Sequence, residues 1–391
     1  MIILVKLAVI ALRILYLPYK LILRPKDKIT MLSRQGDEIP ISYELTKKAL
    51  QEINPDVPVV VLAKKFEGSL LHKAGYCFHV LEQMYHIATS KIVVVDGFCI
   101  PVSVLNHKRD QIFLQMWHAL NIIKKFAYLA LDKPAGVKSD LAKTMCMHRN
   151  YTHILCGCKE SGELLKKSFH AEDAELLITG LPYIDYIMNA QEETAQAMIN
   201  TYPCVKEKET ILYAPTFRRH RSVDIHWIEE KIYLDRYNVV VKLHPVDKRG
   251  IEGKFDSRII WDESYSTHEW LWICDTVITD FSGISVEASL LKRKLYFYLY
   301  DKESYEKEVG LNIDLYEEPI SVYVCETADQ LAEKLKEEYD YSLVQPRRSR
   351  PGYLSVCATT QGPTPPSAAL MRSIISLKIP ATASLGRLSS L

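Results

Sequence analysis

Residues 275–291 read DTVITDFSGISVEASLL, and this stretch decides the fold. Its four consecutive β-branched residues, 276–279, predict a strand buried on both faces. The small residues 282–283 predict a tight turn, and the apolar spacing in 285–291 predicts a helix. A strand that passes through a tight turn into a helix is typical of sheets with parallel strands.

Short apolar runs of the same kind recur on both sides of this stretch, with helical segments such as 160–169 between them. This alternation predicts an α/β fold with parallel sheets. A polar helix near 190–208 marks a plausible break between two halves. The predicted strands are 57–62, 91–96, 111–117, 152–156, 210–213, 238–243, 258–261, 276–279 and 294–299.

The length of 391 residues exceeds the usual size of one hydrophobic core and favours two domains. With 48% hydrophobic and 25% charged residues, the composition excludes a wholly disordered or multi-span membrane protein. We expect one domain over 27–200 and a second over 201–341. Residues 342–391 are rich in Ser, Pro, Thr and Ala, which predicts a disordered tail.

The formal net charge of +1 conceals an uneven distribution along the chain. Residues 1–26 carry five cations and no acid, and residues 341–391 carry six cations and no acid. The middle, 27–340, therefore holds 38 basic against 48 acidic residues. Basic ends on an acidic body indicate a nucleic-acid or membrane partner.

The N-terminal 23 residues favour the membrane among these partners. They are apolar apart from Lys6, Arg13 and Lys20, whose spacing of seven places them on one stripe of a helix. A cationic stripe beside Leu and Ile is typical of a helix that lies in the membrane interface. We therefore expect residues 1–26 to be an amphipathic membrane-surface helix on the cytoplasmic face. Packing on the protein's own body and a true membrane span are the alternatives.

The nine cysteines are scattered, and only Cys156 and Cys158 lie close together. A zinc site needs two close pairs of Cys or His ligands, so we expect no metal. Dispersed cysteines in a large chain are typical of buried thiols in a reducing compartment. We also expect no other cofactor and no nucleic-acid partner.

Polar side chains follow several predicted strands, where ligands bind in parallel sheets. His118 follows 111–117 and is of the right chemical type for a general base, or else for a loop cap. Thr216 and Arg218 follow 210–213, and an arginine fork matches phosphate oxygens. His244 follows 238–243 and is held extended by the proline after it.

The turn in 275–291 has the richest set of polar and small residues. Asp280, Ser282 and Gly283 precede the helix, whose first amide groups suit an anion. Glu287 lies one turn further along, where a carboxylate can bind ribose hydroxyls. Asp280 or Ser282 serving only as a helix N-cap is the alternative.

Together these motifs resemble the CDP-glycerol glycerophosphotransferase family, the teichoic acid primases and polymerases of bacterial cell walls. The resemblance rests on Trp117-His118, 213–218 (YAPTFR), 242–245 (KLHP) and 278–285 (ITDFSGIS), in that order. The stretch 179–185 (TGLPYID) and the Tyr-rich stretch 295–301 extend it. It implies a GT-B-like fold of two Rossmann-type domains that face a central cleft.

The resemblance also implies a reaction and roles for these residues. The donor is CDP-glycerol or a related CDP-polyol, the acceptor is a lipid-linked saccharide or polyol-phosphate chain, and CMP is released. His118 matches the presumed base and His244 the residue that neutralises the leaving phosphate. The residues that match contacts to the donor are Thr216, Arg218, Asp280, Ser282, Gly283 and Glu287.

Two positions differ from the usual pattern of this family. Ala119-Leu120 follows His118 in place of Gly-Thr, and Gly283 stands where a second serine is common. These changes are compatible with a different polyol, a different acceptor or weakened activity. Two other functions stay open: a nucleotide-sugar glycosyltransferase of the same fold, and a non-catalytic relative that binds nucleotide or polymer, which the Ala119-Leu120 change suggests. Lys124 and Lys125 meet acceptor phosphates in one interpretation and lie on a solvated face in the other.

Overall fold

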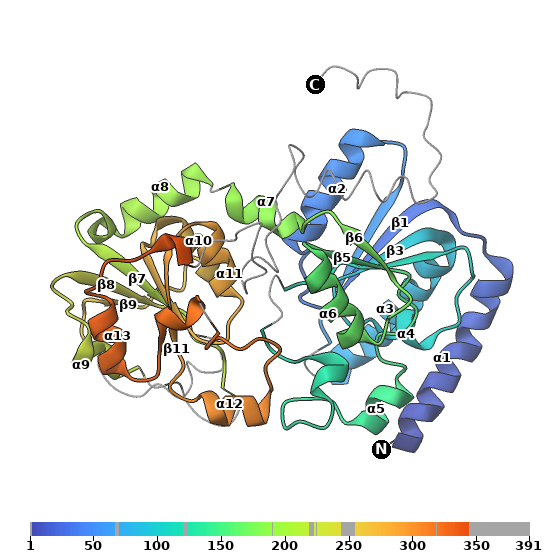
Figure 1. Ribbon diagram of the computed structural model, residues 1–391. Coiled ribbons are helices and arrows are strands. Elements are labelled where there is room, and N and C mark those ends of the chain that lie inside the picture. The colour runs from blue at the N-terminus through green and yellow to red at the C-terminus, as the bar shows by residue number, and fades with distance from the viewer. Residues whose placement is uncertain are drawn as a thin grey trace.

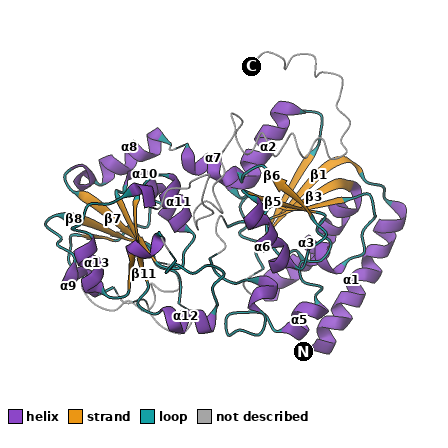
Figure 2. Ribbon diagram, in the orientation of Figure 1, coloured by secondary structure: helices purple, strands orange, loops and turns teal. Residues whose placement is uncertain are grey.

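The chain folds into two halves side by side, each built on a parallel β-sheet with helices around it (Figure 1, Figure 2). The computed structural model describes residues 2–66, 70–119, 123–189, 191–218, 223, 225–243, 255–317 and 319–343. His244 and nearly all of the predicted tail lie outside these residues.

The first sheet contains six parallel strands in the order β2-β1-β3-β4-β5-β6. The chain order reverses between β1 and β3, so the carboxyl ends of these two strands form a topological switch point. The strands are β1 Lys26–Ser33, β2 Val59–Ala63, β3 Ser90–Val95, β4 Ile112–Gln115, β5 His153–Cys156 and β6 Glu175–Ile178.

The second sheet also has six parallel strands, in the order β12-β11-β10-β7-β8-β9. Numbered from β7, this is the 3-2-1-4-5-6 order of the Rossmann fold, with its switch point between β7 and β10. The strands are β7 Glu209–Tyr213, β8 Tyr237–Val241, β9 Ile259–Ile260, β10 Thr276–Thr279, β11 Lys294–Tyr298 and β12 Val324–Cys325.

The α-helices of the described residues connect successive strands and cover the sheets (Figure 2). They are α1 Ile2–Ile22, α2 Ile41–Ile53, α3 Leu70–Thr89, α4 Ile100–Val104, α5 Ser139–Thr144, α6 Lys159–Phe169, α7 Pro182–Met188, α8 Glu192–Thr201, α9 Trp227–Lys231, α10 Thr267–Ile273, α11 Ile284–Leu290, α12 Lys302–Glu308 and α13 Ala328–Lys334.

The predicted α/β fold with parallel sheets is confirmed, and each of the nine predicted strands is present with slightly shifted ends. The sequence analysis missed β1, β6 and β12. Strand β1 lies inside the first sheet, yet its sequence KDKITMLS has no continuous apolar run. Its buried hydroxyls are satisfied by neighbours: Thr30 bonds to Ser90, and Ser33 donates to Asp96. Hydrogen-bond partners therefore allow Thr30 and Ser33 to be buried beside the apolar core residues Ile29, Met31 and Leu32.

Within the described residues, the halves are joined at two places. The helices α7 and α8 lead from the first sheet to the second across the top of Figure 1. At a second place Lys124 forms an antiparallel bridge with Leu311, and the Lys125 amide donates to the Gly310 carbonyl at 2.9 Å. Gly310 has φ +84°, and a Cβ there would lie 2.7 Å from Cε of Lys133. The positive φ therefore favours glycine where the halves meet.

Helix α1 lies along the flank of the first half that faces away from the second (Figure 1). Val9 and Tyr16 are buried against this half, and Arg13 donates to the Val104 carbonyl at 2.8 Å. Arg13 therefore turns toward the body, although the sequence placed it on one cationic stripe with Lys6 and Lys20. The opposite face exposes large apolar residues: Ile3, Leu4, Leu7, Ile10, Ile14, Leu15, Leu17, Leu21 and Ile22. By length and composition alone, α1 is also able to cross a membrane.

Candidate active site

A cleft with a cavity volume of about 510 Å³ opens between the two halves. His118 and Lys124 line it from the first half, and residues that follow β7 and β10 line it from the second. The cleft therefore lies at the switch point of the second sheet, outside the carboxyl ends of its strands, where ligands bind in open α/β sheets.

The cleft brings together most of the residues predicted from the sequence. His118, Thr216, Ser282, Gly283 and Glu287 line it. Arg218 and Asp280 lie behind the wall, in contact with each other. His244 lies outside the described residues, so its role stays a prediction.

His118 is exposed and held at one ring nitrogen. Its Nδ1 lies 2.7 Å from the backbone oxygen of Asp96, and the Gln35 amide nitrogen lies 3.1 Å from the same atom. Because a carbonyl oxygen can only accept, Nδ1 donates to it. The contact therefore leaves Nε2 as the ring nitrogen on which a general base would take up a proton.

In the loop around His118, the left-handed backbone conformation falls on Trp117 and not on Ala119. Trp117 has φ +60°, and Ala119 is outside the set of residues with positive φ. The Trp117 ring packs 4.9 Å from the ring of Phe126 and 5.1 Å from that of Phe169, centroid to centroid. Alanine at 119 therefore carries no backbone strain, and a rigid aromatic wall stands behind the histidine.

Asp96 and Gln35 are site residues that the sequence analysis missed. Both follow the strands at the first switch point: Gln35 follows β1, and Asp96 ends the run 93–96 (VVVD) after β3. The Asp96 carboxyl is buried and accepts from the Ser33 hydroxyl at 2.6 Å, and burial raises its pKa. An acid at the end of an apolar strand was the available signal.

Thr216 offers a hydroxyl to the cleft. Its backbone amide donates to Oδ1 of Asp280 at 2.9 Å, which fixes the loop after β7 against the loop after β10. Its Oγ1 is buried and has no protein partner among the described residues. A buried hydroxyl without a partner is costly, so the geometry suits a ligand oxygen at this place.

Arg218 does not present its guanidinium to the cleft. Its side chain is only 1% exposed, with Nε 2.7 Å from Asp301 and Nη2 2.7 Å from Asp280. The remaining Nη1 donates to the backbone oxygen of Thr216 at 2.7 Å. All three nitrogens are thus engaged by the protein, and the structure gives Arg218 the position of a support for the Thr216 loop.

The loop between β10 and α11 places two small residues in the cleft wall. Gly283 is the N-cap of α11 with φ −58°, and it makes no side-chain capping bond. Because Gly283 holds the N-cap position, neither Asp280 nor Ser282 is the N-cap, and Asp280 instead accepts from Arg218 and the Thr216 amide. The glycine has an ordinary helical φ and serves here by leaving the wall without a side chain.

Glu287 forms a pair with His268, a residue that sequence analysis missed. Its Oε1 lies 3.4 Å from Nε2 of His268, and its Oε2 is buried without a partner among the described residues. His268 and Tyr183 both line the cleft, with ring centroids 5.4 Å apart. This corner combines an acceptor oxygen with two rings, which suits a polar ring ligand with hydroxyl groups.

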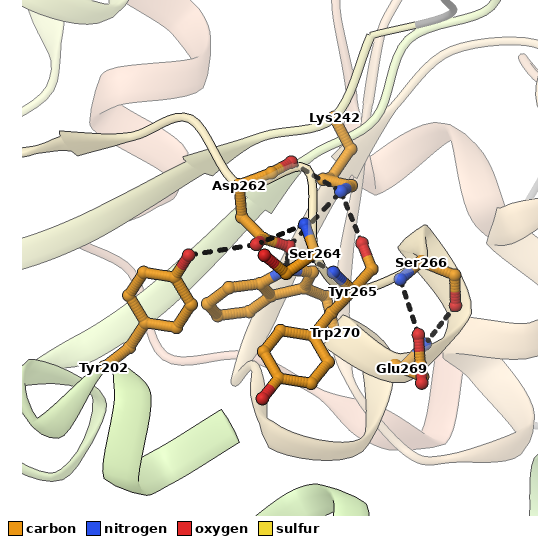
Figure 3. Close-up of polar contacts among 8 residues, drawn as sticks. All are labelled: Tyr202, Lys242, Asp262, Ser264, Tyr265, Ser266, Glu269 and Trp270. Atoms are coloured by element: carbon orange, nitrogen blue, oxygen red, sulfur yellow. Dashed lines mark hydrogen bonds and ion pairs between the residues drawn. The ribbon is translucent and has the colours of Figure 1, made fainter. Parts of the chain in front are cut away.

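Lys242 holds the loop that leads to His268 (Figure 3). Its ammonium donates to the backbone oxygen of Asp262 at 2.7 Å and to that of Tyr265, and lies 3.3 Å from the Asp262 carboxylate. The same carboxylate accepts from the Tyr202 hydroxyl and the Trp270 indole. Lys242 therefore positions α10, which carries His268, and its charge is already paired.

Asp262 links the stability of this loop to pH. Burial raises the pKa of Asp262, but the bonds from Trp270, Ser264, Tyr202 and Tyr265 outweigh it and lower the pKa to about 2. A carboxyl with a lowered pKa stabilises the fold above its unfolded pKa of about 3.9, and this stability is lost as pH falls toward 2. The contribution is roughly 2–3 kcal/mol at pH 7, with about half left at pH 3.

We expect the Asp262→Asn variant to unfold at lower urea concentration than the wild type at pH 7. The difference in unfolding free energy should shrink as the pH falls from 4.5 to 3. The matched control is Asp235→Asn, which removes an exposed carboxylate paired with Arg258 at the surface and should show no such pH-dependent difference. A difference for Asp262→Asn that is constant over this pH range would contradict the assignment.

Known proteins resemble this chain over most of its length. The model of the CDP-glycerol:poly(glycerophosphate) glycerophosphotransferase family matches residues 16–362. The teichoic acid ribitol-phosphate primase of Bacillus spizizenii is 29% identical over 293 residues, covering 72% of this chain and 75% of the relative. The teichoic acid glycerol-phosphate primase of Bacillus subtilis is 27% identical over 344 residues, covering 82% and 86%.

Solved structures share the fold. A variant of the wall teichoic acid polymerase TagF soaked with CDPG aligns with a TM-score of 0.65 at 18% identity, covering 96% of this chain and 97% of that one. The UDP-GlcNAc 2-epimerase of Methanocaldococcus jannaschii aligns at 0.51 with 14% identity, covering 90% and 100%. These likenesses confirm the GT-B-like architecture. With the family model matching most of its length, the chain belongs to the CDP-glycerol:poly(glycerophosphate) glycerophosphotransferase family, the polyol-phosphate transferases that act as primases and polymerases of teichoic acid synthesis.

Proposed function

We propose that this protein transfers glycerol phosphate, or a related polyol phosphate, from its CDP-linked donor to a membrane-linked acceptor and releases CMP. The observation that carries the proposal is the position of His118. Its Nδ1 is anchored to the Asp96 carbonyl, and the residue lines a cleft whose opposite wall carries buried polar atoms that have no partner among the described residues. A base on one half thus faces a polar donor pocket on the other.

In the proposed reaction, the first half removes the proton of the acceptor and the second half holds the donor that loses CMP. The acceptor hydroxyl gives its proton to Nε2 of His118 while its oxygen attacks the phosphorus that carries the polyol. The bond from that phosphorus to the CMP oxygen breaks, and the electron pair leaves with CMP. Phosphoryl transfer depends mainly on positioning and charge neutralisation, so no covalent intermediate on the protein is needed.

The donor is held by the second half in this proposal. The free Oε2 of Glu287 accepts from ribose hydroxyls, and the free hydroxyl of Thr216 donates to a phosphate oxygen. Ser282 and Gly283 leave room for the donor beside them. His244 remains the predicted partner of the leaving phosphate.

A donor screen tests the proposal. The full-length protein is incubated with membrane extract as acceptor and with labelled CDP-glycerol, CDP-ribitol, UDP-sugars or GDP-sugars. We expect CMP release and label transfer with a CDP-polyol only, and the better of the two CDP-polyols identifies the polyol. Transfer from a UDP- or GDP-sugar would favour the glycosyltransferase instead. Saturable CDP binding without turnover of any donor would favour the non-catalytic relative.

We further propose that the protein works at the cytoplasmic face of the membrane as a peripheral protein. The exposed face of α1 supports this, because it presents a continuous row of large apolar side chains beside the exposed Lys6. The same helix packs on the body through Val9 and Tyr16. A helix with one face on the protein and an apolar face outward suits insertion into the lipid interface.

Replacing Leu7, Ile14 and Leu21 by glutamate should release the protein from the membrane fraction. The three side chains are 56%, 65% and 72% exposed, so their loss removes membrane contact and no core packing. The measurement is the share of protein that sediments with membranes. Tyr233→Glu, at an equally exposed site on the second half, is the matched control and should change nothing. Unchanged sedimentation of the triple variant would place the anchor elsewhere.

A further inference from the structure

The described cationic side chains at the cleft differ in whether a carboxylate of the protein already pairs with them. Lys124 and Lys242 line the cleft, and Arg218 lies behind its wall. Arg218 is paired with two aspartates, and Lys242 is paired with Asp262. For the ammonium of Lys124, the structure shows no hydrogen bond or ion pair within the described residues. Lys124 is therefore the described cation that is available to a ligand.

The backbone fixes the position of Lys124 from the other half of the protein. Lys124 itself bridges to Leu311, its carbonyl accepts from the Asn312 side chain at 2.9 Å, and the carbonyl of Ile123 accepts from the Asn312 amide at 2.7 Å. Ile123 is fully buried. Lys124 thus belongs to the first half of the chain but is held against the second half. This position in the cleft wall contradicts the interpretation of Lys124 as part of a solvated face.

The surroundings of Lys124 favour an anionic ligand. Burial lowers its pKa to about 8, Asp280 acts in the opposite direction, and Arg218 adds to the lowering. Because Asp280 is itself engaged by Arg218, it compensates the lysine only in part. A half-buried cation without a full partner is costly, and a bound anion would remove that cost.

We propose that Lys124 binds the diphosphate of the nucleotide donor, so that the first half of the protein grips a donor carried by the second. The proposal deepens the proposed function and rests on it for the identity of the donor. The ligand chemistry is a nucleoside diphosphate. As the acceptor oxygen bonds to phosphorus and the bond to CMP breaks, negative charge grows on the departing phosphate, where the ammonium offsets it.

Binding of CDP and of cytidine by the full-length protein tests this assignment. We expect Lys124→Met to weaken CDP binding by about 10- to 100-fold, the usual effect of losing a charge-assisted hydrogen bond, and to leave cytidine binding unchanged. Lys124→Arg should restore part of the CDP affinity. Lys125→Met is the matched control, because Lys125 is adjacent and absent from the cleft wall, and it should bind CDP like the wild type.

The pH dependence separates a charge contact from a structural role. The wild-type affinity for CDP should fall as pH rises through about 8, because Lys124 loses its proton, and the affinity of Lys124→Met should stay level from pH 7 to 9.5. Of the groups that act on Lys124, Asp280 is a carboxylate and Arg218 a guanidinium, and neither type titrates in this range. The other titratable groups in the cleft wall are His118, His268, Glu287, Lys242 and Tyr183. Burial raises the pKa of Tyr183 well above this range.

The outcomes distinguish this inference from the proposed function. Equal CDP affinity for Lys124→Met and the wild type would overturn the inference even if CDP-polyol turnover is found. CDP binding that depends on Lys124, without turnover of any CDP-polyol, would support the inference and refute the proposed transfer. Thermal unfolding of Lys124→Met at or above the wild-type temperature would show that the variant is folded, because a costly buried charge has been removed.

Discussion

Alanine in place of His118 is expected to lower kcat by about 100- to 10,000-fold, the usual range for a lost general base. The side chain is exposed, its polar contacts among the described residues are at Nδ1, to Asp96 and Gln35, and its ring lies against that of Trp117. Its removal should therefore leave folding and donor KM nearly unchanged. The measurement is CMP release from the best CDP-polyol at saturating acceptor.

His118→Asn gives this prediction a sharper form. The asparagine amide is able to donate to the Asp96 carbonyl as Nδ1 does, but it has no basic nitrogen. Activity should therefore fall as far as in the alanine variant. His226→Ala is the control, since His226 is exposed and stacks on Phe255 outside the cleft wall. CMP release that survives both His118 variants would remove His118 from the mechanism.

Methionine in place of Arg218 is expected to lower the free energy of unfolding by about 3–5 kcal/mol, the cost of leaving buried charges without their partner. Asp280 and Asp301 are 1% and 7% exposed, and both depend on the guanidinium. Their repulsion would also release the Thr216 amide from Asp280. Urea denaturation at pH 7 measures the effect, and donor binding should weaken together with it.

Arg258→Met is the matched control for the buried ion pairs. Arg258 also pairs with two aspartates, Asp235 and Asp256, but its side chain is 47% exposed. Exposed pairs contribute at most about 1 kcal/mol, so this variant should unfold close to the wild type. An equal decrease in the free energy of unfolding for Arg218→Met and Arg258→Met would show that the buried ion pairs of Arg218 stabilise the protein no more than exposed ones.

Whether a residue predicted for the site actually lines the cleft depends on the residues that surround it in the fold. His118, Thr216 and Glu287 follow strands or open a helix in a parallel sheet, and the sheet itself places them at the cleft. Arg218 has the same sequence signal, but Asp301, far along the chain, turns its guanidinium away from the cleft. No local pattern reveals such a partner, because the two residues meet only after the second sheet has formed.

The sequence by itself determined the α/β class, the order of most strands and the family, because apolar runs and loop motifs are local and survive in the chain's linear order. Only the tertiary structure decided which charged side chains are paired inside the protein and which are not. Arg218 and Lys242 are paired with buried aspartates, whereas Lys124 is held against the second half and its ammonium has no ion pair in the described part of the chain. The physical reason is that the effect of a charge depends on burial and on distant partners, which folding alone brings together.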